Sequence, residues 1–223
     1  QAPALVQKCI WNLKQFNQDE YTIKIVTLDN YKDFIDLPSY IEEKFKKGII
    51  SYTQLSDILR FTLLATHGGI WIDSTYLTLS PLPKYVTNHS FFSLTSAIFP
   101  TYSISKGRWA GNFIKFGKND FIALLFKDLF FEYWKNNDQL IDYFLIDYYF
   151  ELLYRNIQSF QENLKKLPQY GDNRHLLNSI LFKEINQIDS SKLEQDIYKI
   201  YKLTYKFKAE KANKQKTYFR EYF

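Results

Sequence analysis

The chain has 223 residues, a formal net charge of +5 and a sequence pI near 9.0. This length allows one domain with a substantial hydrophobic core, and the positive charge suits anionic partners such as phosphorylated small molecules, nucleic acid or an acidic membrane face. The single cysteine, Cys9, excludes an internal disulfide framework and favours a reducing compartment, while no run of residues resembles a signal peptide or a membrane span.

Helix and strand patterns alternate along the first part of the chain. Residues 4–17 carry apolar side chains at helical spacing, which predicts a helix. Residues 22–28 alternate and contain several β-branched side chains, which predicts a strand. A further helix is expected to begin near Pro38 and to stop near Gly48. This alternation is typical of an α/β sheet.

A central segment combines a predicted helix, a glycine turn and a strand. On the helix predicted for residues 52–66, Asp57 and Arg60 are three residues apart and therefore share one side, flanked by apolar residues. Such a pair is costly to bury unless the charges satisfy each other or a ligand satisfies them, so a structural ion pair and a ligand site both stay open. Gly68 can end this helix in the left-handed conformation, and residues 69–73 predict a buried strand.

Asp73 stands at the C-terminal end of this predicted strand, the end where ligands bind in open α/β sheets. A carboxylate in that place can hold a divalent ion that bridges a diphosphate, because hard cations prefer oxygen ligands. In the alternative, structural interpretation, Asp73 opens a turn that Ser74 and Thr75 complete.

The rest of the chain predicts mostly helices. Beyond a strand at residues 91–94, the expected elements are a loop-rich segment at 96–118, helices at about 119–135 and 139–155, and a shorter helix at 174–184. Lys and aromatic residues dominate the end of the chain. We therefore expect one domain over residues 1–206, followed by a basic aromatic tail at 207–223.

Several polar residues in the second half stand in apolar surroundings. The loop Trp109-Ala110-Gly111-Asn112-Phe113 is either a turn packed by its tryptophan or a ligand-lining segment. In the run from Asp142 to Tyr148, Asp142 suits a helix N-cap and Asp147 a buried hydrogen bond, because an aspartate in so apolar a run is rarely a free surface residue.

Two basic positions also have alternative interpretations. Lys202 lies in a short basic segment that predicts an edge strand, where lysine is common. It is either solvated there or placed to neutralise a phosphate. His175 is expected to be structural, with a phosphate contact as the alternative.

Taken together, Leu55-Ser56-Asp57-Ile58-Leu59-Arg60 and Gly68-Gly69-Ile70-Trp71-Ile72-Asp73-Ser74-Thr75 resemble the donor-binding core of GT-A-type glycosyltransferases. The resemblance is closest to the bacterial capsular polysaccharide synthesis glycosyltransferases, which are similar to glycosyltransferase family 32 and have a sugar-binding region with an Asp-x-Asp-like motif. It implies an α/β fold of the GT-A, Rossmann-like nucleotide-diphospho-sugar transferase type with added helices. The resembled enzymes begin with a strand that holds the nucleotide base, so the resemblance implies that this N-terminal strand is missing here.

The resemblance also implies roles for the candidate residues. Asp57 and Arg60 would contact the donor sugar and its phosphates, and Asn112 would bond sugar hydroxyls. Asp73 would bind a divalent cation, Mn²⁺ or Mg²⁺, and Thr75 stands in the place of the second aspartate of the motif, as it does in the resembled capsular group. Because threonine brings no charge, the metal is the weaker part of this prediction.

The same resemblance implies that the catalytic residue lies in the run from Asp142 to Tyr148. Asp147 is favoured over Asp142 for a position beside the reacting sugar carbon, because related enzymes place an acidic or amide residue there. Lys202, in a Lys-Leu-Thr segment similar to one that ends the family's domain, would offset the charge of the leaving diphosphate.

These roles predict a hexosyltransferase that moves a sugar from a UDP-sugar donor to a glycan or lipid-linked glycan acceptor in capsular or other surface polysaccharide synthesis, with retention of configuration. We expect a cytoplasmic location. The basic tail either rests on the acidic inner face of the plasma membrane or forms a plain solvated helix. The alternative is a catalytically silent subunit that binds the nucleotide-sugar, which Thr75 and the missing strand favour. A nucleic-acid partner is not expected, because no stacking or groove-reading motif is present.

Overall fold

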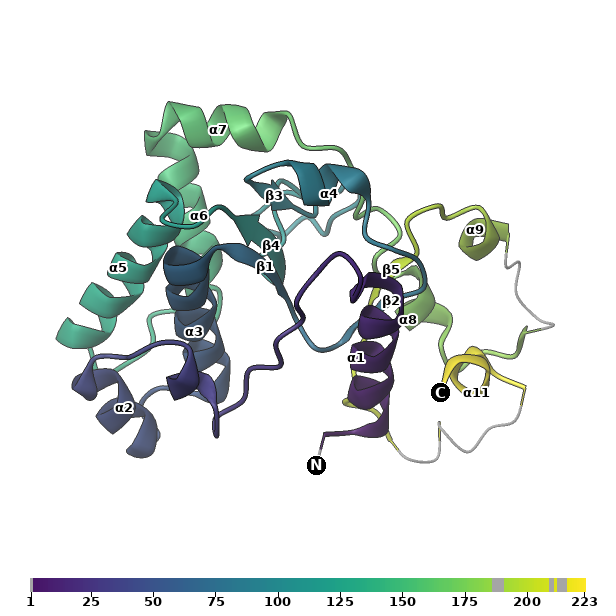
Figure 1. The fold of residues 1–223 in the computed structure, drawn as a ribbon, viewed down its shortest axis with the longest axis horizontal. Helices are drawn as coiled ribbons and strands as arrows, with labels where there is room; N and C mark the ends of the chain where they lie inside the picture. The colour runs from purple at the N-terminus through teal and green to yellow at the C-terminus, as the bar shows by residue number, and fades with distance from the viewer. Residues whose placement is uncertain (1, 186–190, 209–210, 212–215) are drawn as a thin grey trace. The chain divides into compact units, whose positions relative to one another are not determined.

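The computed structural model describes residues 2–185, 191–208, 211 and 216–223, and these form two compact units. Unit 1 comprises Gln1–Lys24, Ile72–Asn88 and Gln169–Phe223, and unit 2 comprises Ile25–Trp71 and His89–Pro168. The colour ramp of Figure 1 shows that each unit joins segments that are distant in the sequence.

Unit 2 contains a three-stranded sheet of order β1-β4-β3 and most of the long helices. The strands are β1 (Gly69–Ile72, whose last residue belongs to unit 1), β3 (Phe92–Ser93) and β4 (Phe113–Phe116). β3 and β4 are antiparallel, with Phe92 opposite Lys115. The helical elements are η1 (Tyr31–Asp33), α2 (Ser39–Lys46), α3 (Tyr52–His67), α5 (Phe121–Asn136), α6 (Leu145–Asn156) and α7 (Gln158–Lys165).

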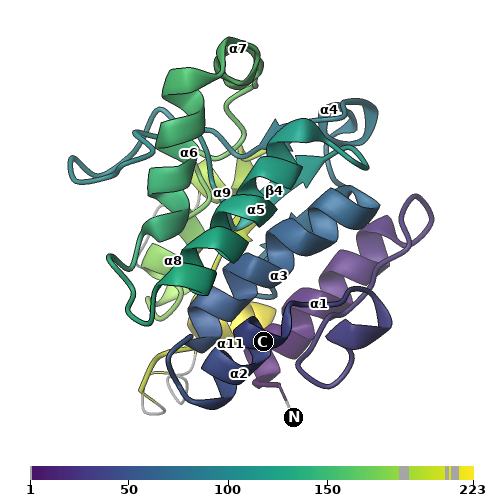
Figure 2. The same ribbon diagram turned by 90° about the vertical axis from the view of Figure 1, so that its left-hand side faces the viewer.

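Aromatic side chains form the core of unit 2. Helices α3 and α5 lie side by side (Figure 2), and Phe61 of α3 stacks on Phe126 of α5 with ring centroids 4.1 Å apart. Phe150 of α6 packs against both rings, and Trp109 stacks on Phe150 at 5.2 Å. Since such rings bury large apolar areas, the aromatic content of the sequence is in good part core packing.

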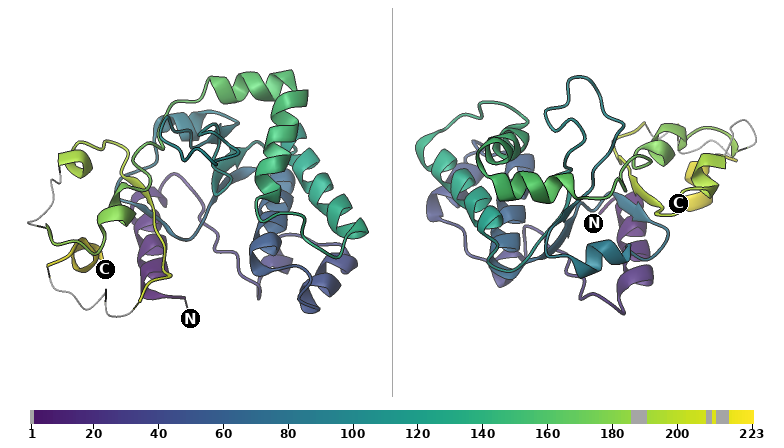
Figure 3. Two further views of the ribbon diagram at one scale, coloured as in Figure 1. Left: turned by 180° about the vertical axis from the view of Figure 1, so that it is seen from behind. Right: turned by 90° about the horizontal axis from the view of Figure 1, so that it is seen from above.

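Unit 1 is built on a two-stranded antiparallel sheet. β2 (Tyr76–Thr78) pairs with β5 (Ile200–Lys202), and α1 (Ala4–Asn17) packs along β2. The shorter helices are α4 (Lys84–Asn88), α8 (Leu176–Ile180), α9 (Ser191–Glu194) and α11 (Tyr218–Tyr222), which Figures 1 and 3 show from several sides.

The described part of the predicted tail contributes to the core of unit 1. Tyr218 is buried in one hydrophobic cluster with Leu5, Cys9 and Tyr201, and Phe207 and Phe219 pack against it. The predicted boundary between residues 206 and 207 stays a prediction, because residues 209–210 and 212–215 lie outside the described residues. In the part of the chain that the structure describes, no helix has both the length and the apolar character needed to cross a membrane.

Most predicted elements are confirmed, with three corrections. The strand predicted at residues 69–73 forms as β1, but its residues are exposed or half-buried rather than buried. The strand predicted at residues 22–28 is wrong, because this segment has no regular secondary structure and is largely exposed. Alternating β-branched residues favour extended backbone, but a strand also needs a partner that completes its hydrogen bonds. The helix predicted from residue 139 begins only at Leu145. The Asp142 carboxylate accepts from the Phe144 N–H at 2.7 Å, so Asp142 caps a turn ahead of the helix rather than the helix itself.

The fold is mixed α/β, as the sequence predicts. Its sheets are small, and the β3–β4 and β2–β5 pairings are antiparallel. The finer assignment to a GT-A, Rossmann-like fold stays a prediction.

Candidate functional site

Helix α3 positions the first pair of predicted site residues in unit 2. The Ser51 hydroxyl caps the helix by accepting from the Gln54 N–H at 3.3 Å. Two turns of this helix then place Arg60 Nη1 at 2.5 Å from Asp57 Oδ1. Both residues are only 5% exposed, so the prediction that they share one helix side among apolar residues is confirmed.

The turn after α3 places strand β1 next to the Asp57–Arg60 pair. Gly68 ends the helix with φ at +69° and ψ at −160°, a conformation essentially restricted to glycine. A β-carbon there would lie 2.5 Å from the Lys118 backbone nitrogen. Position 68 therefore requires glycine for two reasons, its backbone conformation and the lack of space for a side chain. β1 then places the Trp71 ring 5.0 Å from the Arg60 guanidinium carbon, a cation–π contact.

Asp147 of α6 is close enough to the same arginine for the two charges to interact. The Trp109 indole Nε1–H donates to Asp147 Oδ1 at 2.7 Å. Burial raises the pKa of the Asp147 carboxyl above its ordinary range, and the Trp109 hydrogen bond and the positive charge of Arg60 offset part of that rise. The Arg60 guanidinium is therefore paired with Asp57 and also acts electrostatically on a second predicted carboxylate, Asp147.

The other two predicted residues of unit 2, Asp142 and Asn112, lie in turns. Asp142 belongs to the turn ahead of α6, whereas Asp147 interacts electrostatically with Arg60. Asn112 is half-buried in the turn before β4, where the Phe113 N–H donates to the Ala110 carbonyl at 3.0 Å. This turn lies directly on α6, because a β-carbon on Gly111 would approach the Ile146 side chain to 2.8 Å.

Sequence reasoning missed the residue that fixes Trp109. The Arg108 guanidinium carbon lies 4.5 Å from the Trp109 ring centroid, and Arg108 Nη2 contacts Glu151 Oε2 at 2.5 Å. Arg108 also donates to the Ile104 and Ser105 carbonyls at the base of the long β3–β4 connection, which extends away from the strands (Figure 3). An arginine next to a tryptophan inside a Gly-Asn loop was the available signal.

In unit 1, strand pairing brings Lys202 to Asp73. β5 runs antiparallel to β2 with Lys202 opposite Tyr76, and the Leu203 N–H donates to the Thr75 carbonyl at 2.9 Å. The Lys202 ammonium consequently reaches both predicted metal ligands. Its Nζ lies 2.8 Å from Asp73 Oδ2 and 2.7 Å from Thr75 Oγ1.

This contact bears on the divalent ion that the resemblance implies. The atoms expected to hold the ion, the Asp73 carboxylate and the Thr75 hydroxyl, both accept from Lys202 Nζ. Among the described residues, His, Cys, Asp and Glu side chains form no group of three or more that could hold a metal. With an ammonium in that place, the described donor set does not fit an ion held by the protein.

Two further basic residues stand beside Lys202. The Lys202 N–H donates to the Arg174 carbonyl at 2.6 Å, and Arg174 Nε donates to His175 Nε2 at 3.1 Å. Burial lowers the pKa of the His175 imidazole, and the charges of Arg174 and Lys202 lower it further. Sequence reasoning had considered His175 but missed Arg174, its neighbour in the chain.

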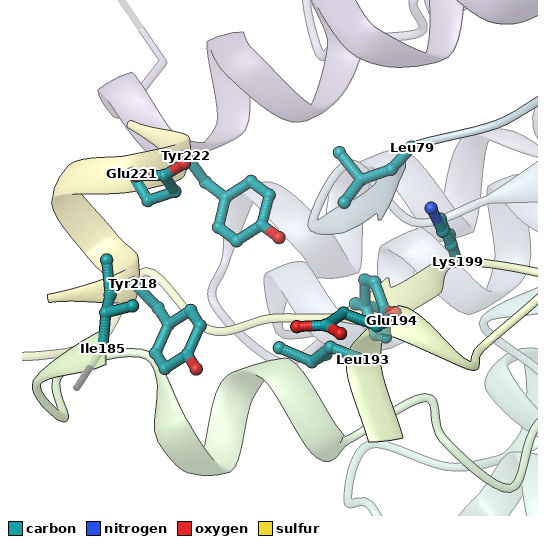
Figure 4. Close-up of a pocket in the computed structure, with 9 residues that line it drawn as sticks. Leu79, Ile185, Leu193, Glu194, Lys199, Tyr218, Glu221 and Tyr222 are labelled. Atoms are coloured by element: carbon teal, nitrogen blue, oxygen red, sulfur yellow. The ribbon is translucent and has the colours of Figure 1, made fainter. Parts of the chain in front are cut away.

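A separate cavity of about 290 Å³ also lies within unit 1. Figure 4 shows that α9 and α11 supply most of its lining. Its lining residues are Leu79, Ile185, Leu193, Glu194, Lys199, Tyr201, Tyr218, Glu221 and Tyr222. None of the predicted site residues is among them. The cavity is therefore distinct from the residues around Arg60 in unit 2 and from those around Lys202 in unit 1.

Comparison with known proteins matches the chain to a family model. No curated protein and no solved structure matches the chain. The family model described as "capsular polysaccharide synthesis protein" matches residues 1–222. The chain therefore belongs to the capsular polysaccharide synthesis protein family.

Proposed function

We propose that this protein is a glycosyltransferase of surface polysaccharide synthesis that takes its sugar from a nucleoside diphosphate donor, a UDP-sugar. Membership of the capsular polysaccharide synthesis family supports a role in capsule synthesis. The sugar-transfer chemistry is supported by the side chains described above, since the family description names no reaction.

The proposal rests on Arg60, a buried arginine that is paired with Asp57, packs against the Trp71 indole ring and acts electrostatically on Asp147. Sugars present hydroxyl groups, which donate to carboxylates and accept from a guanidinium, and apolar C–H faces, which pack on aromatic rings. Arg60, Asp57 and Trp71 supply these groups together. A pair serving only to fix α3 would not need the second carboxylate, Asp147, whose burial is unfavourable for its charged form.

The proposed reaction breaks the bond between sugar C1 and the β-phosphate oxygen and forms a bond from C1 to the acceptor oxygen. The acceptor hydroxyl proton passes to the leaving phosphate, so the products are the glycoside and UDP, and no protein nucleophile is needed. Arg60 and Asp57 orient the donor sugar, Asn112 contacts sugar hydroxyls, and Asp147 offsets positive charge that develops at C1. Lys202 offsets charge on the leaving diphosphate. We propose retention of the anomeric configuration.

A glycan or a lipid-linked glycan is the proposed acceptor. A cytoplasmic location at the inner face of the plasma membrane would give access to a lipid-linked acceptor. The excess of basic residues suits an anionic lipid surface.

The test is release of UDP from a panel of UDP-sugars by the purified full chain, with and without added capsular oligosaccharide. We expect slow hydrolysis of one donor, faster release with an acceptor, and loss of at least ~100-fold in turnover for Arg60→Lys, which keeps the charge but not the planar donor geometry. Lys14→Ala is the control, because Lys14 lies in the last turn of α1, outside both clusters.

Two results would overturn the proposal in different ways. Binding of UDP-sugars without hydrolysis or transfer would assign a silent nucleotide-sugar-binding subunit. Full turnover by the Arg60→Lys enzyme would show that the buried arginine does not belong to the donor site.

A further inference from the structure

The pairing of Lys202 with Asp73 and Thr75 has the arrangement that a metal ion would otherwise have. In the resembled enzymes the Asp-x-Asp oxygens bind a cation that meets the donor diphosphate. Here the same two positions direct one carboxylate oxygen and one hydroxyl oxygen to Lys202 Nζ, at 2.8 and 2.7 Å. The lysine side chain is 19% exposed and that of Asp73 is 27% exposed, so the group is shielded from water but reachable.

We infer that the Lys202 ammonium replaces the divalent cation, and that Lys202 and Arg174 bind the diphosphate of the donor without metal. The inference rests on the proposed function, because it identifies how the same donor's diphosphate is held. It differs from the function expected from the resemblance, in which Asp73 and Thr75 hold the ion.

The hydrogen-bonding capacity of Lys202 suits this role. An ammonium has three N–H donors, and two of them are directed to Asp73 and Thr75. The third can donate to a phosphate oxygen. The backbone at Lys202 is fixed on both sides of the strand, by pairing with Tyr76 and by its hydrogen bond to the Arg174 carbonyl, so the ammonium is pre-oriented.

The charges of the neighbouring side chains explain why threonine rather than aspartate suits position 75. Asp73 alone neutralises Lys202, which leaves the positive charge of Arg174 to attract an anion. An aspartate at position 75 would make the trio of side chains at 73, 75 and 202 negative, and a diphosphate would then need a metal ion. Threonine accepts the Lys202 hydrogen bond without adding charge.

Arg174 supplies a second cationic donor. Its Nε is used by His175, while its Nη1 is buried and has no hydrogen-bond partner among the described residues. Leaving a buried charged donor unsatisfied is unfavourable, and an anionic ligand would satisfy it. The neighbouring His175 lies in the field of both Arg174 and Lys202, which places all three basic residues in one neighbourhood.

The experiment is calorimetric titration of the full chain with UDP, once in EDTA and once in excess Mn²⁺. We expect affinities within about threefold of each other for the wild type. Lys202→Ala should weaken UDP binding in EDTA by roughly tenfold or more, since a charge-assisted contact is lost. Lys206→Ala, four residues away at an exposed position, is the charge-matched control and should bind as the wild type does.

Thr75→Asp provides an independent test that keeps Lys202. It should weaken UDP binding in EDTA by roughly tenfold and make it dependent on Mn²⁺, because the added carboxylate completes a metal-binding pair. Circular dichroism of each variant establishes that it is folded. Strict dependence of the wild type on Mn²⁺, or binding in EDTA that neither Lys202→Ala nor Thr75→Asp weakens, would overturn the inference while leaving the glycosyltransferase proposal in place.

A different result would count against the proposed donor. If UDP binds the wild type in neither solution, the UDP-sugar donor is wrong. Inorganic pyrophosphate titrated in EDTA then tests the cationic subsite by itself, and failure of pyrophosphate to bind would overturn the inference as well.

Discussion

The Asp57–Arg60 pair combines a structural and a functional role at the scale of single residues. Both side chains are almost fully buried, and replacing one partner would leave the other charge without its nearest counter-ion. We expect Asp57→Leu or Arg60→Met alone to lower the free energy of unfolding by about 3–5 kcal/mol. Together, the two substitutions should restore part of that loss, because an apolar pair of similar volume replaces the ion pair while Asp147 still loses the positive charge of Arg60.

Urea denaturation of the two single variants and the double variant measures this coupling, and UDP release measures the function. A stable but inactive double variant would separate ligand binding from helix packing. If the stable double variant kept its turnover, the pair would be structural only, which is the alternative that the sequence leaves open.

The Asp147 carboxyl predicts a pH-dependent stability. Its pKa is raised above the ordinary value of 3.8, chiefly by burial, so the folded state binds this proton more tightly than the unfolded state does. The unfavourable contribution of Asp147 is therefore absent below about pH 3.8 and grows as pH rises through the folded pKa. Asp147→Asn removes that contribution and can still accept from the Trp109 indole.

We accordingly expect Asp147→Asn to be more stable than the wild type at neutral pH, with the difference vanishing in acid. Urea midpoints at pH 7 and near pH 3.5 test this. Equal midpoints at pH 7 would show that the Asp147 carboxylate is well solvated. Activity should fall by at least ~10-fold if this carboxylate acts at the sugar.

The α3–β1 turn makes a prediction at the scale of elements. Gly68→Ala combines an unfavourable backbone conformation, about 1–3 kcal/mol, with overpacking against Lys118, about 1–3 kcal/mol. Gly48 is the control, because its φ of +74° is also positive but a β-carbon there would meet nothing within 4 Å. We expect Gly48→Ala to show only the backbone cost in urea denaturation. Similar losses for the two variants would contradict the close approach of Gly68 to Lys118.

How far the elements could be predicted depends on how local their causes are. α1 and α3 were predicted closely, because periodic apolar residues and a glycine stop are encoded within the helix itself. The strand expected at residues 22–28 failed, because strand formation depends on a partner that the local sequence does not reveal. The late start of α6 was missed because the Asp142 side chain forms a turn two residues ahead of it.

At the scale of the whole molecule, the grouping of the site residues was the least predictable feature. Asp57, Arg60, Asn112 and Asp147 belong to unit 2, whereas Asp73, Thr75 and Lys202 belong to unit 1. The motif spacing links Arg60 to Asp73 along the chain, but only the β2–β5 register shows that Lys202 contacts Asp73 and Thr75. A contact between residues more than a hundred positions apart can be seen only in the tertiary structure. This contact places the Lys202 ammonium at the two residues that the sequence assigns to a metal ion.

The net charge of +5 leaves two classes of anionic ligand to be separated on the intact chain. If the protein binds nucleotide-sugars, UDP at about 100 times its dissociation constant should stabilise the folded state by about 2.7 kcal/mol. For a chain of this size that is an increase in Tm of roughly 5–11 °C. UMP, which lacks the β-phosphate, should give a smaller shift. Scanning calorimetry with UDP, UMP and a short single-stranded oligonucleotide at low salt tests this. A Tm raised by the oligonucleotide and not by UDP would instead show that the positively charged protein binds nucleic acid.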